Sequence, residues 1–187
     1  MITLVLGGSG SGKSAYAEHL LDGKTNKYYS ATMQVYDAEG GKKVARHRRL
    51  RAGKGFVTME QPRDIGEVDF SKRAQQAMEP PDRAGQNVTE RPRCALLECM
   101  SNLAANEVFS PEGAKEHAYE AICDGILHLK EQAADVCVVT NEIFSDGMVY
   151  DKETENYQRL LGKINAYLAE ISDVCYEVVY GIPLRIK

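Results

Sequence analysis

Short apolar runs alternate with segments of helical periodicity along this chain. The runs that predict β-strands cover residues 2–6, 27–31, 94–98, 135–140 and 173–180. Most of the segments between them carry apolar residues three and four positions apart, which places these residues on one side of a helix. Because strands that alternate with helices are typical of parallel sheets, the pattern predicts an α/β fold.

Two helices are the clearest in this pattern. One spans residues 152–171, where apolar residues recur at helical spacing and acidic residues lie in the first turn, near the positive end of the helix dipole. The other is expected to begin at Ser110 and Pro111, since serine is a frequent N-cap and proline fits the first helical position, and to run through Leu129.

Residues 63–93 interrupt the alternation. The stretch "MEPPDRAGQNVTERPR" carries three prolines, many polar groups and few large apolar residues, which is typical of a surface loop or insertion. Neither flank holds enough strands for a closed core, and a chain of 187 residues suits one domain. We therefore predict a single domain over residues 1–187, with a loop or insertion at 63–93.

Composition and charge narrow the class of protein. Hydrophobic residues make up 43% and charged residues 27% of the chain, the balance of a soluble globular protein. A net charge of -4 argues against general nucleic-acid binding, which usually needs a basic domain. No apolar run is long enough for a signal-peptide core or a membrane span, so we expect a cytoplasmic protein. The five cysteines lack paired spacing, which favours free buried thiols.

The strongest local motif is "GGSGSGKS" at residues 7–14, which matches GxxxxGK[ST] between an apolar strand and a helical segment. That context indicates a phosphate-binding loop rather than a flexible glycine turn. The backbone N–H groups of the loop would surround a phosphate, Lys13 would reach the terminal phosphates and Ser14 would bind magnesium. The predicted nucleotide-binding residues of the loop are Gly7, Gly8, Ser9, Gly10, Ser11, Gly12, Lys13 and Ser14.

Polar residues end two further apolar strands. "CALLEC" offers Glu98 at the end of a buried strand, where a carboxylate would complete a magnesium site with Ser14; a carboxylate exposed where the strand leaves the core is the simpler alternative. "VVTNE" places Asn141 and Glu142 at the edge where parallel sheets bind ligands, and a strand-ending turn explains them equally well.

The segment "VARHRRLR" at residues 44–51 sets His47 among four arginines. Most charged runs of this kind are solvated helix faces, and the spacing alone favours that interpretation. In a helix, however, Lys43, His47 and Arg51 would share one side. The cations would lower the pKa of the imidazole, keep it neutral and nucleophilic, and offset the charge of a bound triphosphate.

Taken in order, the motifs resemble one family. They are the phosphate loop, "YYSAT", "YDAEGGKKVARHRRLRAGKGFVTMEQP", "LLEC", "VVTNE" and the ending "GKINAYLAEISDVCYEVVYGIPLRIK". Over most of its length except 63–93, the chain is similar to the bifunctional adenosylcobinamide kinase/adenosylcobinamide-phosphate guanylyltransferase family of cobalamin assembly. The resemblance implies a RecA-like P-loop NTPase sheet flanked by helices, and a homo-oligomer, commonly a trimer.

The same resemblance implies two magnesium-dependent reactions on a corrinoid substrate. A nucleoside triphosphate, ATP or GTP, phosphorylates the aminopropanol hydroxyl of adenosylcobinamide, and GTP then supplies GMP to that phosphate. The resemblance makes His47 the carrier of GMP and, with Lys13 and Glu98, a catalytic residue. Other nucleotide-binding residues would be Lys43, Arg51 and Glu60. The positions that match the family are Asp37, Glu39, Arg51, Thr58, Glu60, Gly162 and Asn165.

Two stretches depart from the family pattern. After "NE" the family usually has a glycine-rich, apolar loop ending in proline, whereas this chain has "IFSDGMVYD". Glu155 and Gln158 stand where arginines are expected before Gly162. Because these positions bear on the corrinoid contacts, two other functions stay open: a different small-molecule P-loop kinase without a covalent intermediate, and a nucleotide-binding regulatory protein without catalysis.

Overall fold

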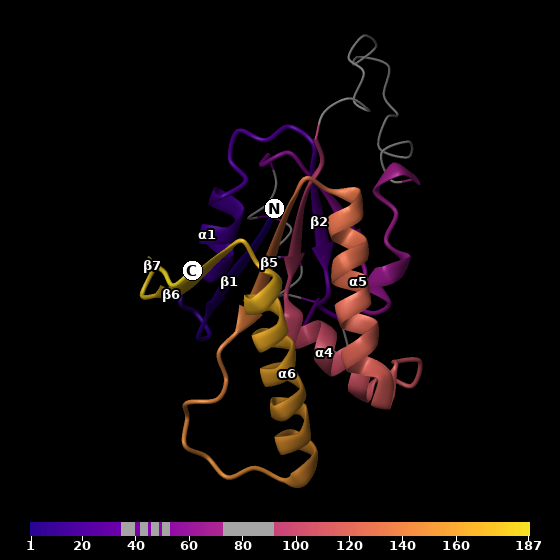
Figure 1. The fold of residues 1–187 in the computed structure, drawn as a ribbon, viewed down its shortest axis with the longest axis vertical. Helices are drawn as coiled ribbons and strands as arrows, with labels where there is room; N and C mark the ends of the chain where they lie inside the picture. Colours follow the sequence, from indigo (N-terminus) through magenta and orange to yellow (C-terminus); the bar gives the residue numbers. More distant parts are fainter. Residues whose placement is uncertain (35–39, 42–44, 46–48, 50–52, 73–91) are drawn as a thin grey trace.

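The computed structural model describes residues 1–34, 40, 41, 45, 49, 53–72 and 92–187. Its strands are β1 (Ile2–Gly7), β2 (Lys27–Ala31), β3 (Phe56–Glu60), β4 (Cys94–Glu98), β5 (Asp135–Asn141), β6 (Val174–Val179) and β7 (Ile182–Arg185). Over these described residues they form one seven-stranded sheet in the order β3-β2-β4-β5-β1-β6-β7 (Figure 1). Every neighbouring pair is parallel except β6 and β7, which are antiparallel.

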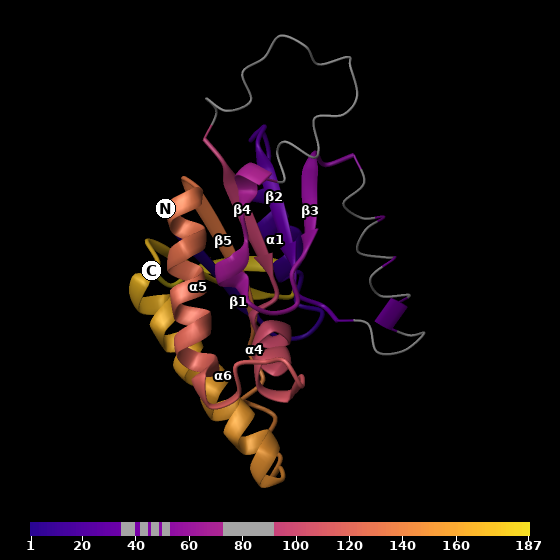
Figure 2. The same ribbon diagram turned by 90° about the vertical axis from the view of Figure 1, so that its right-hand side faces the viewer.

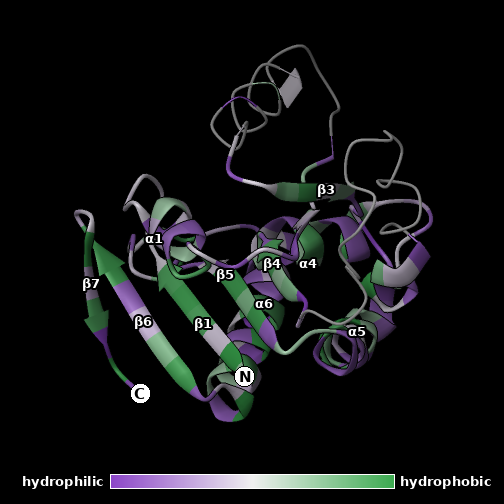
Figure 3. Cartoon of the chain, turned by 90° about the horizontal axis from the view of Figure 1, so that it is seen from above, coloured by the Kyte–Doolittle hydropathy of each residue, from purple (hydrophilic) through white to green (hydrophobic). Residues whose placement is uncertain are grey.

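Helices cover both faces of the sheet. Helix α1 (Lys13–His19) lies on one face, and α4 (Met100–Phe109), α5 (Ala118–Gln132) and α6 (Lys152–Ile171) lie on the other (Figure 2, Figure 3). A short 3-10 helix, η1 (Ile65–Glu67), packs against α5. Of the helices in the described part of the chain, none is both long and apolar enough to cross a membrane.

The predicted α/β sheet is confirmed, and the five predicted strands coincide with β1, β2, β4, β5 and β6 to within one residue at each end. Four of them, β1, β2, β4 and β5, bury nearly all of their side chains between two helical layers, which is why they are mostly apolar runs in the sequence, while β6 is only partly buried. The pattern missed β3 and β7, the two edge strands. β7 has four residues, all exposed, and contains Pro183, while β3 carries the polar residues Thr58 and Glu60 and buries little, so neither has the continuous apolar run of a buried strand.

The predicted helix start at Ser110 and Pro111 is wrong. Ser110 is the C-cap of α4, where its N–H donates to the carbonyl oxygen of Asn106 at 3.0 Å. A turn follows, in which the Gly113 N–H donates to the carbonyl oxygen of Ser110 at 3.0 Å, and α5 begins only at Ala118. A serine followed by proline starts turns as readily as helices, so this local signal did not distinguish the two.

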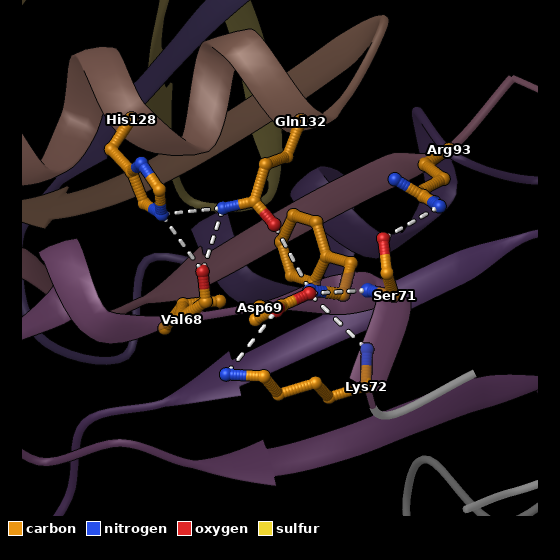
Figure 4. A network of polar contacts seen from close by, with 8 residues as sticks. Val68, Asp69, Ser71, Lys72, Arg93, His128 and Gln132 are labelled. Carbon is orange, nitrogen blue, oxygen red and sulfur yellow. Dashed lines mark hydrogen bonds and ion pairs between the residues drawn. The ribbon is translucent and has the colours of Figure 1, made fainter. Parts of the chain in front are cut away.

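The range predicted as a surface loop or insertion, 63–93, begins with a packed segment. Val68 and Phe70 are core residues, with 3% and 0% of their surface exposed. The side-chain amide of Gln132 on α5 donates to the carbonyl oxygen of Val68 at 2.6 Å and accepts the N–H of Phe70 at 3.0 Å (Figure 4). The prediction is therefore wrong for the part before residue 73, while 73–91 lies outside the described residues.

Candidate nucleotide-binding site

The phosphate-binding motif lies at the carboxyl end of β1, and β1 lies between β5 and β6 in the sheet. Gly12 precedes α1 with a φ of 94°, a left-handed conformation that glycine adopts without strain. A Cβ atom at Gly7 would lie 2.6 Å from the carbonyl oxygen of Val178, so the loop also packs too close to β6 for a larger residue. The loop backbone therefore depends on glycine for both its turn and its packing.

Lys13 is the first residue of α1 and is 8% exposed. Its ammonium group donates to the carbonyl oxygen of Gly8 at 3.0 Å, so the side chain lies back along the loop. Burial lowers the pKa of Lys13, while the neighbouring Cys99 and Glu98 act in the opposite direction. A phosphate beside the loop would also favour the charged form, because an opposite charge stabilises a poorly solvated cation.

Ser14 and Glu98 meet in the structure although they are far apart in sequence. The Ser14 hydroxyl donates directly to Oε1 of Glu98, and the hydroxyl of Tyr29 donates to Oε2 of Glu98 at 2.6 Å. Since β5 separates β4 from β1, the carboxylate reaches the loop from two strands away. The sequence prediction named Ser14 and Glu98 as a pair, and the structure brings them into contact.

The Ser14–Glu98 pair fits a magnesium ion by its chemistry. Hydroxyl and carboxylate oxygens are the ligands that Mg²⁺ prefers, and P-loop proteins hold the ion with a loop Ser or Thr and a carboxylate from a buried strand. Among the described residues, no cluster of three or more His, Cys, Asp or Glu side chains is placed to hold a metal. In P-loop proteins, phosphate oxygens of the nucleotide and water commonly complete the set of ligands.

A network of polar side chains joins the carboxyl ends of β2, β4 and β5 around this pair. The hydroxyl of Thr32, just after β2, accepts the N–H of Cys99 at 2.7 Å and donates to the carbonyl oxygen of Cys99 at 2.8 Å. Asn141 at the end of β5 donates to Oγ of Ser101 at 2.5 Å, and Asn106 donates to the carbonyl oxygen of Thr32 at 2.8 Å. The sequence analysis missed Thr32, Ser101 and Asn106. The available signal for Thr32 was its position directly after a buried strand.

Further polar residues near the end of β5 make local contacts. The Glu142 carboxylate accepts the N–H of Phe144 at 2.8 Å and the hydroxyl of Ser145 at 2.9 Å. These contacts form a turn after β5, which the sequence offered as the alternative to a ligand-binding role. On α6, Asn165 accepts the hydroxyl of Thr140 at 2.7 Å and so joins this helix to β5. Through these contacts, Glu142 and Asn165 stabilise the chain at the carboxyl end of β5.

Of the residues expected to carry and bind GMP, the structure describes Glu60 and none of the other three. His47, Lys43 and Arg51 lie outside the described residues, so their roles stay predictions. Glu60 ends β3, and the order of strands places β3 four positions from β1. At a strand spacing of about 4.8 Å, that separation is roughly 19 Å between the two strands.

These features define a P-loop nucleotide-binding protein: a glycine-dependent loop after a central parallel strand, a buried lysine, and a serine that meets a carboxylate from another strand. A likeness to a solved structure supports the class at the level of fold. An ATPase from the type III secretion system of pathogenic bacteria is similar with a TM-score of 0.51 and 11% identity. The match covers 94% of this chain, which spans about half of that protein (50%).

The chain belongs to the cobinamide kinase / cobinamide phosphate guanyltransferase family, whose model matches residues 3–186. It is 27% identical to the bifunctional adenosylcobalamin biosynthesis protein CobU of Escherichia coli K12 and 28% identical to that of Salmonella typhimurium LT2, with each chain covered completely (100%). It is 25% identical to the CobP protein of Pseudomonas aeruginosa over 100% of this chain and 98% of the relative. The family resemblance inferred from the motifs is confirmed.

Proposed function

We propose that this protein catalyses both reactions for which its family is named. A nucleoside triphosphate phosphorylates the aminopropanol hydroxyl of adenosylcobinamide, and GTP then transfers GMP to the new phosphate. The contact between Ser14 and Glu98, beside the buried Lys13, carries the proposal for the first reaction, because it unites the parts that phosphoryl transfer needs. The family match over residues 3–186 supports the pair of reactions.

In the kinase step the protein acts by positioning and charge. The loop N–H groups would bind the β- and γ-phosphates, and the Lys13 ammonium would leave the carbonyl oxygen of Gly8 to contact them. Ser14 and Glu98 would hold magnesium, which when bound offsets the charge on the phosphate oxygens. The hydroxyl of the acceptor loses its proton as its oxygen attacks the γ-phosphorus. The bond between the γ-phosphorus and the nucleoside diphosphate then breaks.

In the guanylyl step we propose that His47 carries GMP. A neutral imidazole nitrogen would attack the α-phosphorus of GTP, form a phosphorus–nitrogen bond and release pyrophosphate. A phosphate oxygen of adenosylcobinamide phosphate would then attack the same phosphorus, and the imidazole nitrogen would leave. Lys43, Arg51 and Glu60 are proposed to bind the nucleotide. The roughly 19 Å between β3 and β1 favours separate nucleotide positions for the two steps.

The corrinoid acceptor is proposed to lie over the loop between β5 and α6. This loop starts beside the phosphate site, where the N–H of Glu142 donates to the carbonyl oxygen of Gly7 at 3.1 Å, and it extends away from the sheet (Figure 1). Met148 and Val149 are 67% and 90% exposed there. Such an apolar surface suits a large, partly apolar acceptor. The surface lies in the stretch where this chain departs from the usual family loop.

We also propose that the chain assembles with copies of itself, as the family resemblance implies. The edge strand β7 and its flanks expose apolar side chains, among them Ile182, Leu184 and Ile186. Exposed apolar side chains that lie together suit a surface covered by another chain. The number of copies, expected to be three, is measured by light scattering.

Labelled GTP tests the proposed function. With magnesium, GTP labelled at the α-phosphate should label the wild-type protein, and GTP labelled at the γ-phosphate should not. His47→Asn should abolish labelling and GMP transfer while leaving phosphorylation of adenosylcobinamide largely intact. His117→Asn is the matched control, because this exposed histidine lies in the short turn before α5. Labelling of the His47 variant at the wild-type level would place the carrier elsewhere.

A further inference from the structure

Tyr29 is a buried residue of β2 whose hydroxyl reaches the nucleotide site. It is 2% exposed, and its ring packs edge-on against Phe56 with the ring centroids 5.9 Å apart. In the register of β2 and β4, Tyr29 pairs with Leu96, and Glu98 is the next residue of β4 on that face. The phenol therefore points along the sheet toward the Glu98 carboxylate.

The two oxygens of Glu98 have different partners. Oε2 accepts the Tyr29 hydroxyl at 2.6 Å, while Oε1 accepts the Ser14 hydroxyl. A hydrogen bond to a carboxylate is stronger than one between neutral groups, and the tyrosine that donates it is held by a strand and a packed core. Because one oxygen is held by β2, the carboxylate is oriented with its other oxygen toward the phosphate loop.

We infer that Tyr29 is a positioning residue for nucleotide-bound magnesium, acting through Glu98. The inference rests on the proposed function, in which Ser14 and Glu98 hold the ion. Tyr29 belongs neither to the phosphate loop nor to β1, which leads into that loop. The Tyr29 hydroxyl therefore acts on the ion by orienting the Glu98 carboxylate. Partners that orient a metal ligand in this way commonly change metal affinity by about 10–100-fold when they are removed.

The test compares two neighbouring buried tyrosines of β2 whose hydroxyls have different partners, Glu98 for Tyr29 and Arg93 for Tyr28. Tyr29→Phe removes the hydroxyl and keeps the ring against Phe56. Tyr28→Phe is the matched control, because Tyr28 is equally buried, at 1% exposed, but stacks on Phe70 on the opposite face of the sheet. Binding of the β,γ-imido analogues of ATP and GTP is measured by calorimetry, once with magnesium and once with EDTA.

We expect Tyr29→Phe to weaken nucleotide binding about tenfold in magnesium and to leave binding in EDTA unchanged. Tyr28→Phe should change neither value. Equal weakening of Tyr29→Phe in magnesium and in EDTA would show a general structural role and overturn the inference.

Glu98→Gln separates failure of the inference from failure of the proposed function. If Glu98→Gln loses the magnesium-dependent part of binding and Tyr29→Phe keeps it, the positioning role of Tyr29 is wrong while the role of Glu98 stands. If Glu98→Gln keeps the full magnesium dependence, the proposed role of Glu98 fails, and the role of Tyr29 fails with it. Circular dichroism of all three variants checks that the fold is retained.

Discussion

Phe70→Ala tests whether the segment before residue 73 belongs to the core. The Phe70 ring is 0% exposed and stacks on the ring of Tyr28, with the centroids 4.5 Å apart. Removing a buried phenylalanine costs about 3–5 kcal/mol, which includes the cavity left behind. The hydrogen bond from the Phe70 N–H to Gln132 uses the backbone and would survive, so we expect a loss of about 4 kcal/mol.

That loss is large against a total stability of about 5–15 kcal/mol for a domain. At about 2–4 °C per kcal/mol for a chain of this size, the thermal midpoint should fall by about 8–16 °C. Urea titration followed by circular dichroism measures the free energy of unfolding directly. Phe144→Ala is the control, because its ring is 44% exposed, and it should cost less than about 1 kcal/mol. If the two variants lost equal stability, the segment would be the surface loop that its sequence predicts.

Two further predictions concern the phosphate loop and acid stability. Lys13→Ala should reduce nucleotide affinity and kinase turnover by orders of magnitude, because the phosphates in the loop would lose the Lys13 cation and face only backbone donors of the loop. Unchanged affinity by calorimetry would exclude this loop as the site. The N–H of Ile2 donates to the Asp173 carboxylate at 2.6 Å and lowers the pKa of that carboxyl. The hydrogen bond therefore stabilises the fold above an ordinary aspartate pKa of about 3.9, and this stabilisation is lost as the pH falls through the lower pKa of the folded state. Asp173→Asn should therefore be less stable than wild type at pH 7, with a gap that narrows in urea titrations below about pH 4; a gap independent of pH would contradict this.

The features that the sequence alone determined are those with a local cause. The motif at residues 7–14 could be identified because a phosphate loop needs glycine, lysine and serine at fixed spacing, and each stands in one short stretch. The parallel strands β1, β2, β4 and β5 could be identified because both of their faces are buried, which makes each a mostly apolar run; the parallel edge strand β3, which buries little, could not. The helix at Lys152–Ile171 was equally clear, since its apolar residues recur at the helical period.

The tertiary structure decided which distant residues meet, because the order of strands in a sheet depends on the packing of the whole chain. Ser14 and Glu98 were predicted to form one magnesium site, but only the order β4-β5-β1 shows how they come into contact. The role of Tyr29 was invisible in sequence, where it is one apolar position in a buried run; the register of β2 and β4 aims its hydroxyl at Glu98. Phe70 lies in a polar stretch but is a core residue, because its ring stacks on Tyr28 while Gln132, far along the chain, accepts its backbone N–H.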